Sequence, residues 1–95
     1  MRKITINRRP RVTLRVRQIM RAHRLSAYRL ERALEGVLSP STVYRFVSKK
    51  QKRVDLETLA WIIYGINSLC ETKYKLSDFL RYEETPLESR GVKEE

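Results

Sequence analysis

Few side chains in this chain could carry out catalysis. The 95 residues include one histidine, His23, and one cysteine, Cys70. His23 precedes an arginine in a predicted helix, a setting typical of a surface residue rather than of a general base. Metal sites need several ligands at defined spacing, and one histidine with one cysteine cannot supply them. The three glycines form no phosphate-binding or dinucleotide-binding pattern. We therefore predict no enzyme activity, no metal, no cofactor and no small-molecule substrate.

Basic side chains, by contrast, are abundant and concentrated in one half of the sequence. Residues 1–53 hold 16 of the 21 lysines and arginines and only two acidic residues, which gives a net charge of +14, whereas residues 54–95 carry −4. A surface that serves solubility mixes the two signs. Separation of this kind is typical of a protein that binds a polyanion, and nucleic acid is the first candidate.

Membranes are also polyanionic, but the sequence favours them less. The basic residues surround a predicted globular core and lie opposite no broad exposed apolar face. The longest apolar run, roughly 59–66, is far shorter than a membrane-spanning helix. Because Cys70 is alone, an internal disulfide is impossible, and a reducing compartment is expected. We predict a cytoplasmic protein with no membrane partner.

The basic half contains two short predicted helices. The first covers Ser26 to Glu35, with Ser26 as N-cap and apolar residues at helical spacing. Gly36 suits the turn that follows. Ser39 and Pro40 mark the next start, because proline is tolerated at the first helical position. The second helix is predicted over Pro40 to Ser48.

A helical wheel divides this second helix into an apolar and a polar side. Val43, Phe46 and Val47 fall on one side, while the other carries hydroxyls, a tyrosine and an arginine. Arginine can pair bidentately with guanine, and serine or threonine can bond to base edges or phosphates. The basic residues that follow the helix would meet flanking phosphates: Lys49, Lys50, Lys52 and Arg53. An ordinary amphipathic helix with a solvated polar face remains the alternative interpretation.

The other elements are predicted from caps and spacing. Thr13 is expected to cap a helix through about His23, and Asp55 one from Leu56 to about Ser68. A short final helix is expected near Ser77. The chain is thus predicted to be all-α, a compact bundle of four to five helices over 13–82, with a basic N-terminal arm over 1–12 and an acidic, disordered tail over 83–95.

Two details of this arrangement stay open. The helix from Leu56 is apolar nearly all round, so we expect the C-terminal stretch to cover Tyr64, while Trp61 packs in the core or in an interface. Three arginines of the arm, Arg8, Arg9 and Arg11, could follow or enter a minor groove. Alternatively, residues 4–6 form a short strand against the region near Arg81, and the arginines are solvated.

The segments from Leu25 to Leu30, from Ser41 to Phe46 and from Val54 to Ala60 together resemble the Cro/cI-type (Xre-like) helix-turn-helix domain of phage and bacterial regulators. The resemblance covers roughly residues 13–82 and implies a repressor-like bundle whose third helix enters the major groove, in proteins that often bind as dimers. Ala27 replaces the usual glutamine of the family, and the turn is about two residues longer.

The resemblance implies a set of contact residues. Base contacts are expected from Ser41, Thr42, Tyr44 and Arg45. Contacts to the DNA backbone are expected from Ser26, Tyr28, Arg29, Ser39, Ser48 and the four basic residues of 49–53. Two functions follow as hypotheses. In the first, the protein binds a specific double-stranded DNA sequence, with a homodimer as a possible form, and regulates transcription, most simply as a repressor. In the second, it is an antitoxin-like or phage-adaptor module that uses the same fold to bind protein or RNA.

Overall fold

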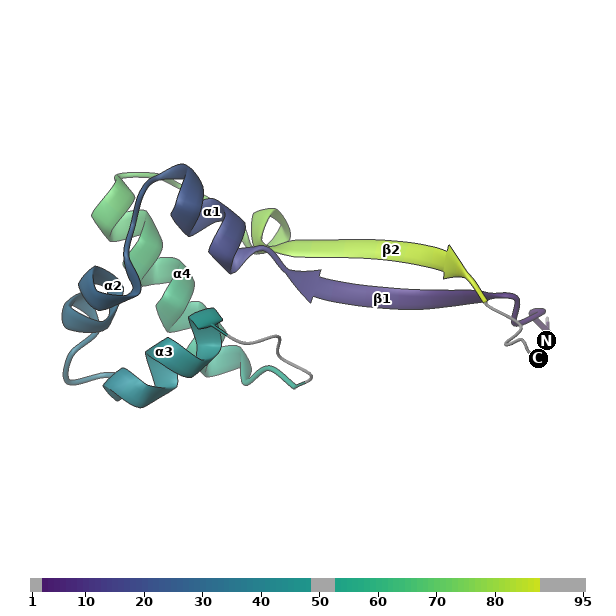
Figure 1. The fold of residues 1–95 in the computed structure, drawn as a ribbon, viewed down its shortest axis with the longest axis horizontal. Coiled ribbons are helices and arrows are strands. Elements are labelled where there is room, and N and C mark those ends of the chain that lie inside the picture. Colours follow the sequence, from purple (N-terminus) through teal and green to yellow (C-terminus); the bar gives the residue numbers. More distant parts are fainter. Residues whose placement is uncertain (1–2, 49–52, 88–95) are drawn as a thin grey trace.

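The computed structural model describes residues 3–48 and 53–87. Helices gather at one end, and a two-stranded ribbon projects from them, so that the longest dimension is 48 Å (Figure 1). In chain order the elements are β1 (Arg8–Leu14), α1 (Val16–Ala22), α2 (Ala27–Ala33), α3 (Pro40–Ser48), α4 (Leu56–Cys70), the 3-10 helix η1 (Leu76–Phe79) and β2 (Leu80–Pro86).

The expectation of an all-α fold is wrong. β1 and β2 form an antiparallel pair in which Arg8 lies opposite Pro86 and Leu14 opposite Leu80. The structure is therefore a small mixed domain of helices and a two-stranded sheet, in which residues 8–12 of the expected N-terminal arm pair with the end of the expected bundle and the start of the expected tail. The alternative prediction was a short strand at residues 4–6 beside the region near Arg81. Its partner region is correct, but the paired residues are 8–14.

Local caps set the starts of three helices as predicted. The Ser26 hydroxyl accepts a hydrogen bond from the Arg29 amide at 3.1 Å, and Ser39 Oγ accepts one from the Thr42 amide at 3.2 Å. The α4 cap at Asp55 is also confirmed. The start of α1 at Thr13 is wrong, because Thr13 pairs with Arg81 in the ribbon, and α1 begins after Arg15 without a side-chain cap.

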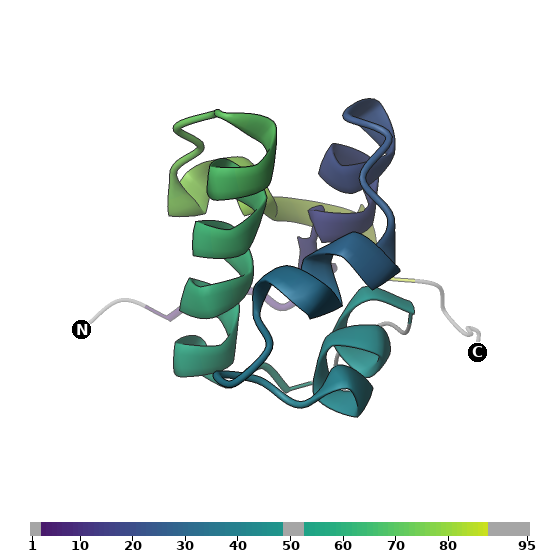
Figure 2. The same cartoon turned by 90° about the vertical axis from the view of Figure 1, so that its left-hand side faces the viewer.

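The core lies between the four helices and is closed by η1. Figure 2 shows α4 along one side of the helical end, with the three shorter helices along the other. Phe79, Leu30 and Ile62 are completely buried. At Gly65 an added Cβ would come within 2.9 Å of Leu30 Cδ1, so a larger residue there would force the Leu30 side chain to move.

The loop after α4 connects the core to the ribbon. Asn67 Oδ1 accepts hydrogen bonds from the Thr72 hydroxyl at 2.8 Å and the Tyr74 amide at 2.9 Å, and its Nδ2 donates to the Tyr74 carbonyl. The Tyr74 hydroxyl lies 2.7 Å from His23 Nε2 at the end of α1. These contacts fix the chain as it enters η1 and then β2.

Cover for Tyr64 is absent from the described residues, so that expectation is wrong. Tyr64 is 62% exposed, whereas Trp61 is half-buried against the core. The two rings meet edge to face at 5.8 Å on the outer side of α4. The C-terminal stretch that was expected over Tyr64 instead turns away into the ribbon.

Candidate nucleic-acid interface

The α3 helix is held by its apolar side and presents a polar side to solvent. Val43 is completely buried and Phe46 is 7% exposed, so both anchor α3 in the core. On the opposite side Tyr44, Arg45 and Ser48 are exposed. The predicted division of this helix into two sides is therefore confirmed, together with its bounds at Pro40 and Ser48.

The four predicted base-contact residues do not have equal access to a ligand. Tyr44 is 41% exposed and Arg45 is exposed, so both reach outward from a docked helix. Ser41 is exposed as well, but Thr42 is half-buried, and its hydroxyl lies 2.7 Å from Ser39 Oγ. Tyr44 and Arg45 are thus the best placed of the four, while Thr42 serves the start of the helix.

Three of the predicted DNA-backbone residues have structural roles. Ser26 and Ser39 cap α2 and α3 through their side chains. Ser48 Oγ donates to the Tyr44 carbonyl. These hydroxyls are exposed but already engaged within the chain.

The α2 surface carries a pair of an aromatic and a cationic side chain, Tyr28 and Arg32, of which only Tyr28 was predicted as a contact residue. Tyr28 is exposed, and the Arg32 guanidinium carbon lies 5.9 Å from the centre of its ring. Arg32 Nη1 is also 3.5 Å from the Tyr28 hydroxyl, at the limit of a hydrogen bond. The spacing of four residues on one helix was the signal for this pair. Arg29 is exposed on the same helix.

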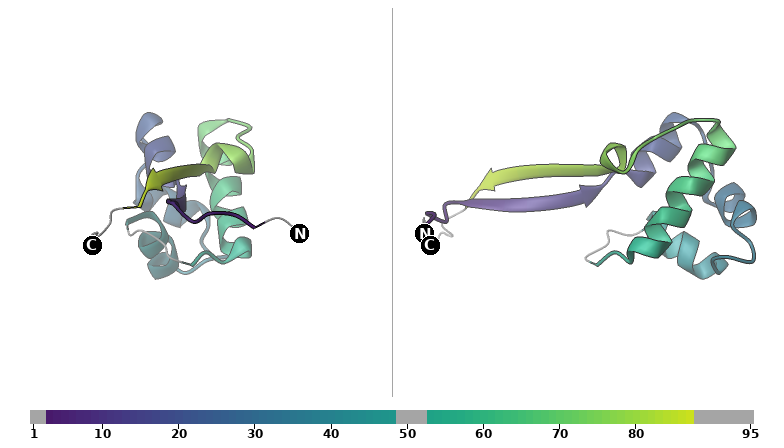
Figure 3. Two further views of the ribbon diagram at one scale, coloured as in Figure 1. Left: turned by 90° about the vertical axis from the view of Figure 1, so that its right-hand side faces the viewer. Right: turned by 180° about the vertical axis from the view of Figure 1, so that it is seen from behind.

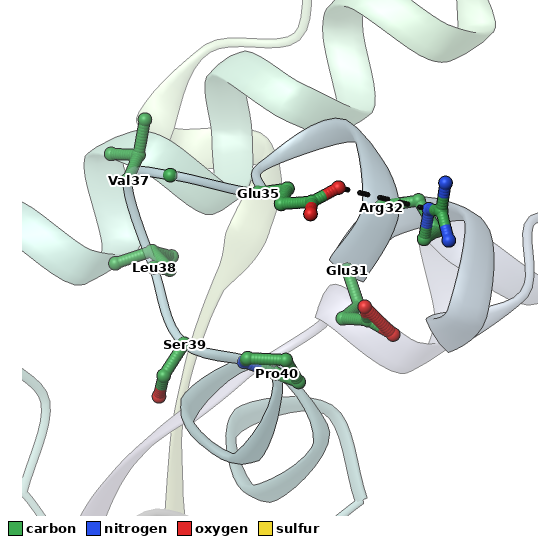
Figure 4. Close-up of a pocket in the computed structure, with 8 residues that line it drawn as sticks. Glu31, Arg32, Glu35, Val37, Leu38, Ser39 and Pro40 are labelled. Carbon is green, nitrogen blue, oxygen red and sulfur yellow. Dashed lines mark ion pairs between the residues drawn. The ribbon is translucent and has the colours of Figure 1, made fainter.

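The long turn between α2 and α3 forms an open hollow with acidic side chains (Figure 4). Glu31 and Glu35 contribute to its lining, and Arg32 Nε lies 3.8 Å from Glu35 Oε1. Gly36 at this turn has a φ of +91°, which favours glycine. Because Arg32 also lines the hollow and offsets one of the two carboxylates, the hollow keeps a net charge of −1 and should attract phosphates less than the outward side of α3 does.

The basic segment after α3 is described only at its end. Lys49, Lys50 and Lys52 lie outside the described residues, and Arg53 is exposed just before the cap of α4. Asp55 accepts hydrogen bonds from the Thr58 hydroxyl at 2.8 Å and the Thr58 amide at 3.0 Å. The hydroxyl first and then the amide hold the pKa of the Asp55 carboxyl below its ordinary value.

The three arginines predicted to contact DNA from the arm lie in β1 and have different surroundings. Arg8 Nε lies 3.2 Å from Glu84 Oε1, and Arg8 Nη2 donates to the Glu84 carbonyl at 2.8 Å. Because side chains alternate along a strand, Arg9 and Arg11 lie on the other face of the ribbon. The ribbon extends away from the α2 end of the molecule (Figure 1), so a ligand that contacts α3 and these arginines must extend along the ribbon.

Other binding chemistries find little in the described part of the chain. Residues 3–48 and 53–87 contain no group of three His, Cys, Asp or Glu side chains that could hold a metal ion. Across the same ranges no helix has the length and apolar character needed to cross a bilayer. No family model, no curated protein and no solved structure matches this sequence.

Proposed function

We propose that the protein binds double-stranded DNA in a sequence-specific manner through α3 and acts as a transcriptional regulator, most simply a repressor that occupies its operator. The observation that carries the proposal is the outward side of α3. A short helix anchored by Val43 and Phe46 presents Tyr44 and Arg45 to solvent, within the half of the chain that carries +14.

This arrangement meets the physical needs of base readout. A helix docked by buried side chains holds its outer groups in fixed positions, which direct hydrogen bonding to base edges requires. An arginine guanidinium presents two parallel donors that match O6 and N7 of guanine. The surrounding basic residues supply the electrostatic attraction to phosphates that dominates DNA affinity.

The first test is the salt dependence of binding to a fluorescent duplex. Because each neutralised phosphate releases counterions, log affinity should fall linearly with log salt, with a slope of about −0.9 for each phosphate contacted. A flat dependence, or a duplex affinity no larger than that of an unrelated basic protein, would contradict DNA binding.

A second test separates base readout from attraction to phosphates. Arg45→Lys keeps the positive charge but loses the two-pronged donor geometry. We expect this variant to keep its salt slope and its affinity for random duplex while losing preference for the selected sequence. A matched variant, Arg21→Lys on α1, should leave both properties unchanged.

A second candidate function rests on the acidic turn. Glu31 and Glu35 stand beside the start of α3, where a phosphate backbone would be repelled but a basic protein surface would be attracted. The protein- or RNA-interaction hypothesis therefore keeps one specific observation, which favours a protein partner. Loss of duplex binding in the salt titration, together with capture of a basic partner that Glu31→Lys abolishes, would favour this candidate.

A further inference from the structure

The ribbon exposes large apolar side chains near its middle. Val12 and Tyr82 lie opposite each other near its middle, and each is 62% exposed. Two strands alone are at best marginally stable in water. Unpaired strand edges also offer hydrogen-bonding groups to another strand. The question is therefore which edge of this ribbon could accept a partner.

Two hydrogen bonds at the ends of the ribbon fix which backbone groups face outward. The Leu87 amide donates to the Asn7 carbonyl, and the Arg15 amide donates to the Phe79 carbonyl. Bonded and non-bonded pairs alternate along an antiparallel ladder. Every second pair inside this frame is therefore bonded, and the pairs in between turn their amides and carbonyls outward. The outward pairs are Arg8 with Pro86, Pro10 with Glu84, Val12 with Tyr82 and Leu14 with Leu80.

The outer edge of β1 is a poor template for another strand. Pro10 has no amide hydrogen, and its nitrogen faces outward near the middle of this edge. A strand added along β1 would leave one of its own carbonyls without a donor there. Proline at an outward position is a common protection of sheet edges.

The outer edge of β2 also ends in a proline without an amide hydrogen, Pro86, but its central groups from Leu80 to Glu84 form a self-complementary set. The Leu80 amide already donates to the Ser77 carbonyl, and the Glu84 carbonyl already accepts from Arg8. In an antiparallel pair of β2 with a second β2 centred on Tyr82, Leu80 would face Glu84 of the second copy. The Leu80 amide of one copy and the Glu84 carbonyl of the other, each already hydrogen-bonded within its own chain, would therefore face each other. The Glu84 amide would then face the Leu80 carbonyl, and the Tyr82 amide would face the Tyr82 carbonyl.

The side chains beside this edge are complementary in charge under the same symmetry. With Tyr82 at the centre, Arg81 lies directly opposite Glu83 of the second copy, and Glu83 opposite Arg81. Opposite charges in such cross-strand positions stabilise a sheet. Within one chain Arg81 Nε and Glu83 Oε1 are already 3.6 Å apart, and Glu83 pairs with Arg11 of β1. The dimer would extend this alternation of charge across the sheet.

Space for a second copy is available along β2. Among the described residues, no helix lies alongside the outer edge of β2 beyond η1 at its start (Figures 1 and 3). We propose that two copies of the chain associate through the outer edges of β2, centred on Tyr82, to form a four-stranded antiparallel sheet in the order β1, β2, β2, β1. This association does not depend on DNA binding.

Proline variants on the two edges test the proposal with matched controls. Tyr82→Pro removes the central outward amide on β2, whereas Val12→Pro removes the outward amide directly opposite on β1. Sedimentation velocity over a range of concentrations should show a monomer–dimer equilibrium for the wild type. Tyr82→Pro should raise the dimer dissociation constant by about tenfold or more, because two reciprocal hydrogen bonds are lost, while Val12→Pro leaves it unchanged. Circular dichroism checks that both variants fold.

Charge variants provide a second test that a loss of folding cannot imitate. Arg81→Glu and Glu83→Arg each place like charges opposite each other in a homodimer, so each variant alone should sediment as a monomer. A mixture of the two restores both opposite-charge pairs, and a heterodimer should form. A wild type that is monomeric at every soluble concentration would overturn the proposal. So would equal weakening by the two proline variants, or a mixture that stays monomeric.

Discussion

The arginine side chains of α3 and of the ribbon have different surroundings. Arg45 is exposed on a short helix between hydroxyl side chains. Arg8 and Arg81 lie beside Glu84 and Glu83, so much of their charge is compensated inside the ribbon. The comparison shows that a run of basic residues in a sequence is not one binding surface. Part of the +14 of residues 1–53 is offset by Glu84, which is distant from Arg8 in sequence but paired with it in space.

The largest effect is expected from a substitution that uncouples the ribbon from the helical core. Phe79 is completely buried where the ribbon begins, and its carbonyl accepts the Arg15 amide at 2.8 Å. Phe79→Ala should lower the free energy of unfolding by about 3–5 kcal/mol, measured by urea denaturation. Leu76→Ala, on the exposed side of the same 3-10 helix, should cost far less. Similar losses for the two variants would show that Phe79 does not couple the two regions.

Substitution of α3 should change recognition rather than stability. Arg45→Ala should cost about 1–3 kcal/mol of binding free energy for the preferred duplex and relax the preference at one base position. Arg53→Ala should weaken binding to all sequences alike, because its expected partner is a phosphate. Fluorescence anisotropy with matched and mutated duplexes measures both effects. Equal, sequence-independent losses would show that Arg45 is only another phosphate contact.

The two faces of the ribbon should differ by a smaller amount. Arg8→Ala removes an exposed ion pair and a hydrogen bond to Glu84, with an expected loss of about 0.5–1 kcal/mol in ribbon stability. Arg9→Ala, on the other face, should cost almost nothing. Hydrogen exchange at the amides of β2 reports the difference. A larger effect of Arg9→Ala would mean that the Arg8 contacts do not hold the ribbon together.

The smallest effects concern pH, and they have opposite directions in the two regions. The pKa of Asp55 is lowered by Thr58, so its stabilisation of α4 is present above the ordinary carboxyl pKa and is lost as pH falls through the lowered value. The pKa of the Tyr82 phenol is raised, first by its hydrogen bond to Glu84. Its contribution is therefore present below the ordinary phenol pKa and is lost as pH rises through the raised value.

NMR titration of the wild type and of two variants checks these directions. Thr58→Val should move the pKa of Asp55 up toward its ordinary value, and Glu84→Gln should move the pKa of Tyr82 down. A shift in the opposite direction for either group would show that the named hydrogen bond is not the cause.

Local signals predicted the helices well, and non-local pairing explains most of what was missed. Ser26, Ser39 and Asp55 act on amides three residues away, so the sequence alone indicated where three helices begin. The ladder from Arg8 to Pro86 joins opposite ends of the chain, and no local pattern reports which distant segment will pair. The prediction of Thr13 as a helix cap is wrong for this reason, since Thr13 belongs to β1.

The candidate site was predictable to a similar extent. The apolar spacing of Val43 and Phe46 fixed which side of α3 faces outward. The use of hydroxyls inside the chain was harder to predict, because Thr42 and Ser48 look like contact residues until their hydrogen bonds to Ser39 and Tyr44 are seen. Asn67 carried no recognisable signal, since its role depends on a loop that folds back onto it.

We propose that α3, and not the ribbon, reads base sequence. Selection of bound fragments from random duplex DNA, carried out in parallel with the wild type, Arg45→Lys and Arg9→Lys, tests it most directly. We expect one enriched motif for the wild type, the same motif for Arg9→Lys, and loss of preference at a guanine position for Arg45→Lys. No enrichment with the wild type, or an unchanged motif with Arg45→Lys, would contradict the claim.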